Sequence, residues 1–251
     1  MKIVYCLTIA VAALAISSRL SANEIPSLDR LIAEAESRDE WKSAAAITDR
    51  LWLIREAALA RDTVSDPVSD RYLITALAGP IDIVHFFGLA VPVASGKQTR
   101  DEALLFHWKD EGGLDHENGT RFSSPPEAHP DDLPSNALGA LFGEEIRARN
   151  GDLDFDVVTA LREFLLPLEP VSDEIAKKFS HRTIVMGLKE SSSREMVNSR
   201  SEWFTAVPLF SLFAFDRERA QTFGSPEAAL AAAGFEVIEL EGRPIKIERI
   251  K

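Results

Sequence analysis

The segment from Leu73 to Ala94 constrains the fold more than any other part of this chain, because Asp82 and His85 are its only ionisable side chains. A stretch so apolar has to be buried, either in a protein core or in a bilayer. An aspartate at the centre of a bilayer costs ~2.5–3.5 kcal/mol, and Pro80 and Pro92 interrupt the run. We therefore expect a buried helical hairpin at the centre of a folded core. The alternative is a protein that associates with the inner membrane through this segment.

Most of the remaining sequence carries helical patterns. Apolar side chains recur at helical spacing behind Ser27, which predicts an N-cap there and one or two long helices over 28–60. Ser69 is expected to cap a helix over 70–78 that ends at Gly79-Pro80. Further helices are expected over 100–111, over 133–149 after Asp132, from Asp152 or Asp154 to Pro167, and over 226–233.

Two further features complete the predicted fold. Gly139 and Gly143 share one face of the helix predicted over 133–149, so this helix can approach another closely. Two β-prone runs within 235–250 flank a turn and predict a terminal hairpin. The predicted fold class is mainly α. It comprises a single helical domain over 23–251 around the buried apolar hairpin, a long polar loop at 112–132, and a small C-terminal β-hairpin.

The first 22 residues have the pattern of a secretory signal peptide. Lys2 is followed by an apolar run over 3–16 and by small and polar residues that end at Ala22. The run is too short to span a bilayer, which needs ~20 apolar residues. We expect cleavage after Ala22, with Ser17 as the second candidate position, and therefore an extracytoplasmic location, either periplasmic or secreted.

Cleavage would also limit the chemistry and the partners of the mature chain. Cys6 is the only cysteine, so the mature chain would have neither a thiol nucleophile nor a disulfide. Lys2 and Arg19 would be lost, which makes the net charge of −12 two units more negative. An acidic surface repels phosphate backbones and anionic lipids, so we expect no nucleic-acid partner.

The first candidate site is Asp82 with His85. The common catalytic and nucleotide-binding motifs GxSxG, GxxxxGKS/T, HExxH and GxGxxG do not occur in the sequence. Asp82 and His85 would share one helix face at their spacing, and a carboxylate beside an imidazole can orient it as a general base. The alternative is a structural hydrogen bond that fixes the packing of a buried helix.

The second candidate site surrounds the polar loop. Asn136, in the first turn of the helix after Asp132, would lie near backbone N–H groups that can hold an anion or a carbonyl. Simple capping chemistry is the alternative for this junction. Imidazole and carboxylate groups would suit a divalent metal such as Zn²⁺. The candidate metal ligands are His107, His116, His129 and Asp131, at a spacing that matches no known template.

Two functions are compatible with these patterns. The first is an extracytoplasmic helical protein that binds a small-molecule or protein partner. The second is a secreted hydrolase that works by acid–base or metal chemistry. The hydrolase requires the candidate residues to meet around one cleft. Its catalytic residues would be Asp82, His85, Asp132 and Asn136.

Overall fold

The structure is a computed structural model that describes most of the chain between residues 25 and 251. The described residues are 25–44, 46–61, 71–110, 132–149, 155–176, 223, 226–240 and 243–251. The predicted signal peptide and nearly all of the polar loop predicted at 112–132 lie outside them. Among the described residues, no helix combines the length and the hydropathy that crossing a bilayer requires.

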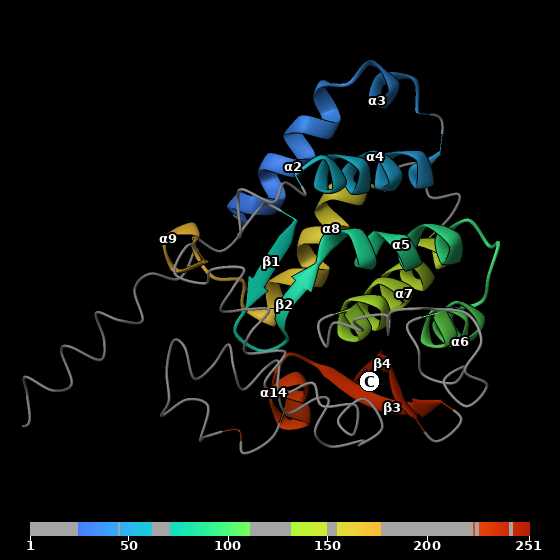
Figure 1. The fold of residues 1–251 in the computed structure, drawn as a ribbon, viewed down its shortest axis with the longest axis vertical. Helices are drawn as coiled ribbons and strands as arrows, with labels where there is room; N and C mark the ends of the chain where they lie inside the picture. Colours follow the sequence, from blue (N-terminus) through green and yellow to red (C-terminus); the bar gives the residue numbers. More distant parts are fainter. Residues whose placement is uncertain are drawn as a thin grey trace, which may run out of the picture.

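The elements are arranged in layers around a central pair of helices, α5 (Ile83–Ala94) and α7 (Asp132–Ala148) (Figure 1). α4 (Ile47–Ala60) covers α5 on one side, whereas β4 (Arg243–Arg249) packs on α7. The predicted mainly α fold with a C-terminal β-hairpin is confirmed. The other elements are α2 (Pro26–Ser37), α3 (Asp39–Ser43), β1 (Tyr72–Thr75), β2 (Gly79–Asp82), α6 (Arg100–Asp110), α8 (Val157–Leu165), the short 3-10 helix η2 (Leu166–Leu168), α9 (Asp173–Ala176), α14 (Pro226–Ala232) and β3 (Phe235–Leu240).

The apolar segment 73–94 lies in the core as predicted, but its first half is not helical. β1 and β2 pair antiparallel with Thr75 opposite Gly79, so the helix predicted over 70–78 is wrong. The Thr75 hydroxyl accepts the Ala78 N–H at 3.1 Å and donates to the Gly79 carbonyl at 2.8 Å. Gly79 has a φ of 77°, which favours glycine at this turn. A short apolar run does not distinguish a buried strand from a buried helix by periodicity, and a Gly-Pro pair is compatible with a helix end or a turn.

Two helix starts also differ from the prediction. α2 begins at Pro26 with Ile25 as N-cap, so Ser27 lies inside the helix. A proline at the first position sacrifices no hydrogen bond, because that N–H would have no partner in the helix. α8 begins after Asp156, whose carboxylate accepts the Val158 N–H at 3.0 Å, and not after Asp152 or Asp154. The predicted stretch 28–60 is divided among α2, α3 and α4.

The close contact between α5 and α7 depends on two glycines of α7. A Cβ atom at Gly139 would overlap the backbone carbonyl of Phe86, and one at Gly143 would lie 2.5 Å from the carbonyl oxygen of Ala90. Both positions are therefore occupied by the backbone of α5 itself. The predicted close approach through Gly139 and Gly143 is confirmed, and its partner is α5.

Four phenylalanines from different elements connect the core across the layers. Phe86 of α5 lies 5.6 Å from Phe142 of α7, measured between ring centroids, and both rings contact Phe164 of α8. Phe164 in turn meets Phe235 of β3 at 5.6 Å in an edge-on arrangement. All four rings are buried, so the terminal hairpin shares the same core as the central helices.

Ion pairs hold β4 against α6 and α7. Arg100, at the start of α6, contacts Glu144 and Glu248 at 2.8 Å each. The Lys246 ammonium hydrogen-bonds Glu248, and this contact, with the charge of Arg100, lowers the pKa of Glu248 from its ordinary value despite its partial burial. Lys246 and Glu248 share one face of β4 and pair with Asp101 and Arg100 of α6. Arg249, on the alternate face, contacts Glu145 of α7.

We predict that Gly139→Ala lowers the free energy of unfolding by about 1–3 kcal/mol or more, because the added methyl group requires α5 and α7 to separate. Chemical denaturation followed by circular dichroism measures the change.

Gly88→Ala on α5 is the matched control. The nearest atom to its new Cβ would be the Arg55 Nε at 4.0 Å, so the methyl group fits. This variant is expected to gain ~0.5–1 kcal/mol from helix propensity. Equal effects of the two substitutions would contradict a close approach at Gly139.

Candidate functional site

Asp82 lies where three elements meet. It ends β2 and is the N-cap of α5, and its side chain is fully buried. Its Oδ1 accepts the backbone N–H groups of Val84 at 2.8 Å and His85 at 3.4 Å. An aspartate at this position satisfies N–H groups that the helix leaves without a partner, and it interacts favourably with the helix dipole.

The second oxygen of Asp82 is held by an arginine. Arg71 donates to Oδ2 from Nε at 2.9 Å and from Nη2 at 2.6 Å. The ion pair is largely removed from water, since the Arg71 side chain is 17% exposed. The Asp82 backbone N–H donates to the Ser135 hydroxyl oxygen at 2.9 Å, which ties β2 to the first turn of α7.

The structure therefore brings together part of the predicted catalytic set. Asp82 and Asn136 are both buried and belong to adjoining elements, because Ser135 beside Asn136 contacts Asp82. His85 is partly exposed one turn along α5. The Asp82 carboxylate contacts the backbone N–H of His85. The observed role of the Asp82 carboxylate is to cap α5 and to pair with Arg71.

The predicted metal ligands cannot be placed. His116, His129 and Asp131 lie outside the described residues, as do the side chains of His107 and Asp132. Within the described ranges, no three histidine, cysteine or carboxylate side chains gather as a metal ion would need. The proposed metal site stays a prediction.

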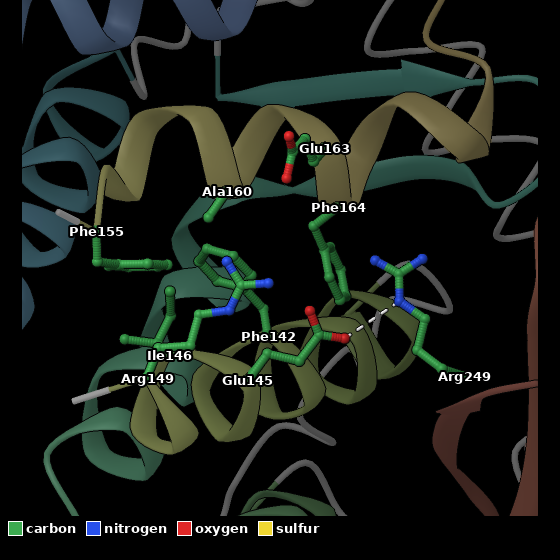
Figure 2. Close-up of a pocket in the computed structure, with 9 residues that line it drawn as sticks. All are labelled: Phe142, Glu145, Ile146, Arg149, Phe155, Ala160, Glu163, Phe164 and Arg249. Carbon is green, nitrogen blue, oxygen red and sulfur yellow. Dashed lines mark hydrogen bonds and ion pairs between the residues drawn. The ribbon is translucent and has the colours of Figure 1, made fainter. Parts of the chain in front are cut away.

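A cavity of about 250 Å³ lies between α7, α8 and the end of β4 (Figure 2). Its size is just below the ~300–1,000 Å³ typical of small-molecule sites. Its walls combine five aromatic or aliphatic side chains with four charged ones. The lining residues are Phe142, Glu145, Ile146 and Arg149 from α7, Phe155 before α8, Ala160, Glu163 and Phe164 from α8, and Arg249 from β4.

Arg249 is fixed at one end of this pocket. Its guanidinium lies over the rings of Phe164 and Phe235, at 4.8 Å and 4.6 Å from the centroids. Its Nε donates to Glu145 at 3.1 Å (Figure 2). Two aromatic faces and one carboxylate thus restrain a side chain that would otherwise be flexible.

Arg149 lies in the middle of the pocket. Figure 2 shows its guanidinium rising from α7 toward α8 beside the ring of Phe155, and its carbon Cζ lies 5.4 Å from that ring centroid. It makes no ion pair with any residue of the described ranges. Glu163 on α8 is exposed and has no ion-pair partner there either. The pocket therefore combines apolar side chains with two exposed charged ones, Arg149 and Glu163, which form no ion pair with the described residues.

Sequence reasoning missed this pocket, although one signal for it exists. In the terminal strand, Arg249 lies two residues after the buried Ile247 and therefore on the same face of the strand. A cationic side chain on the strand face that packs on the core is expected to have an aromatic or anionic partner inside the fold. The partners Phe164, Phe235 and Glu145 come from three other elements, and no local pattern identifies them.

We predict that Asp82→Asn lowers the free energy of unfolding by about 1.5–3 kcal/mol, because Arg71 loses its charged acceptor while the amide still caps α5. Urea titration at neutral pH measures the loss.

Asp156→Asn is the control, since Asp156 caps α8 in the same way but is exposed and forms no ion pair with the described residues. Its effect should stay within about 0.5 kcal/mol. If Asp82→Asn were neutral or stabilising, the Arg71–Asp82 pair would not be a structural contact.

Comparisons with known proteins find no matching family model, no similar curated protein and no similar solved structure.

Proposed function

We propose that this protein is an extracytoplasmic binding protein for a small molecule, and that the pocket between α7, α8 and β4 is its site. The observation that carries the proposal is the cavity itself, of about 250 Å³, walled by Phe142, Phe155 and Phe164. Small-molecule sites generally combine apolar side chains with a few polar groups in fixed positions.

The rigidity of the walls supports a binding role. Phe142 and Phe164 belong to the buried aromatic cluster, in contact at 5.2 Å between centroids. α8 is also tied to α2 by Arg162, which contacts Asp29 at 2.8 Å. A pocket built on packed helices keeps its shape without ligand, so little ordering cost opposes binding.

The extracytoplasmic location rests on the pattern of the first 22 residues. The sequence has a short apolar run behind Lys2, followed by residues that are in the main small and polar up to Ala22. We place the ligand in the same compartment as the mature chain, outside the cytoplasm.

Export is testable directly. When the full chain is produced in a bacterial host, the protein recovered from the periplasm or the medium is expected to begin at Asn23, or at Ser18 if the second position is cut. N-terminal sequencing and intact mass measure this. A full-length chain that stays in the cytoplasm would contradict the proposal.

The pocket is tested with hydrocinnamamide, a neutral probe with one phenyl ring. We expect its proton signals to broaden in the presence of the protein and to sharpen again with Ala160→Trp, because the indole fills the cavity that Ala160 lines. Ala60→Trp, at an exposed position near the end of α4, is the matched control and should leave binding unchanged.

Thermal melting of both tryptophan variants separates lost binding from lost folding. Binding that survives Ala160→Trp in a folded protein would place the ligand elsewhere.

A further inference from the structure

We propose that the ligand is an amphipathic monocarboxylate, with its apolar body between α7 and α8 and its carboxylate on Arg149. This inference rests on the proposed function and names the ligand class of the same pocket. It follows from the orientation of two guanidinium groups, from the charges that oppose them and from the apolar walls between them.

Arg149 offers a hydrogen-bonding edge to the pocket. Its guanidinium lies near the ring of Phe155, 5.4 Å from the centroid, and points into the space between α7 and α8 (Figure 2). A guanidinium beside an aromatic ring keeps its N–H groups available at its edge. Two parallel N–H groups match the two oxygens of a carboxylate, which gives charge and geometry together.

Arg249 supplies a second positive group at the far end. Its Nε is used by Glu145, and in Figure 2 its two terminal nitrogens point away from that carboxylate. Within the described part of the chain, no hydrogen bond of these nitrogens is present. The ion pair with Glu145 cancels most of this charge, so Arg249 strengthens the local positive potential only modestly.

The acidic groups limit the charge of the ligand. Glu145 is neutralised by Arg249, which leaves Arg149 opposite the exposed Glu163. A second negative charge on the ligand would therefore meet repulsion from Glu163 and from an acidic chain of net charge −12. A single carboxylate on an apolar body can pair with Arg149, which forms no ion pair with the described residues, whereas an amine in the same place would set a cation beside Arg149.

The walls define the rest of the ligand. Phe142, Ile146 and Phe164 belong to the packed helices, and Ala160 leaves the space that a larger side chain would fill. A phenyl ring or a short aliphatic chain is complementary to such walls, since burial of apolar surface drives its transfer from water.

Three probes with the same phenyl ring test the ligand class on the full chain as exported and purified. Hydrocinnamate carries the carboxylate, hydrocinnamamide is its neutral analogue, and phenylpropylamine carries the opposite charge. We expect hydrocinnamate to bind at least about tenfold more tightly than hydrocinnamamide at low salt, and phenylpropylamine to bind weakest. Titration calorimetry or probe-signal broadening gives the affinities.

Variants of two neighbouring arginines locate the carboxylate. Arg149→Gln should bring the ratio of hydrocinnamate to hydrocinnamamide affinity down to about one, and Arg149→Lys should restore part of this ratio. Arg147→Gln is the matched control, because Arg147 lies exposed on the same helix but outside the pocket lining. It should keep the preference in full.

The outcomes distinguish this inference from the proposed function. If hydrocinnamamide binds in the pocket but hydrocinnamate gains nothing, or if phenylpropylamine binds best, the carboxylate is wrong while a binding pocket stands. If Arg149→Gln and Arg147→Gln behave alike, Arg149 is not the anchor. If none of the three probes binds, both the inference and the proposed function fail.

Discussion

The close contact between α5 and α7 is the constraint on which the rest of the structure depends. Helices pack this closely only where side chains are absent. At Gly139 and Gly143, the backbone of α5 occupies the space that a Cβ atom would need. The tight pair leaves α4 on one side and the terminal hairpin on the other. It also sets the positions of Phe86 and Phe142, from which the aromatic cluster extends to α8 and β3.

The hydrogen bonds of Asp82 and Ser135 at the first turns of α5 and α7 depend on the same close contact. Two helices that touch along their length bring their first turns close to β2, where backbone N–H groups need acceptors. Asp82 and Ser135 meet that need, and Arg71 balances the buried charge. The Asp82 carboxylate thus has a structural task, since it caps α5 and pairs with Arg71, while the Asp82 backbone N–H binds Ser135 of α7. A buried charge in an apolar segment is equally compatible with catalysis and with capping until its partners are known.

The pocket lies along the side of α7 that faces α8 and β4, where packing is incomplete. Ala160 is small, and Arg149 and Arg249 fill part of the remaining space with guanidinium groups beside aromatic rings. Such an arrangement stabilises the fold little, since exposed ion pairs and cation–π contacts contribute ~0–1 kcal/mol each. It supplies directional N–H donors and aromatic side chains for a ligand with one charge and an apolar body. α7 therefore packs on α5 through its glycines and also lines the proposed recognition site.

The sequence by itself determined the helical class, the apolar segment 73–94, the glycine pair of α7 and the terminal hairpin, because each is encoded by the spacing of neighbouring residues. It also predicts the signal peptide, which the described residues do not include. The tertiary structure decided that 72–82 forms a hairpin, that Asp82 pairs with Arg71, and that Arg149 and Arg249 line one pocket with Phe164. These features depend on contacts between residues far apart in the chain. Local periodicity does not encode which distant side chain will satisfy a buried charge or leave a cavity beside a ring.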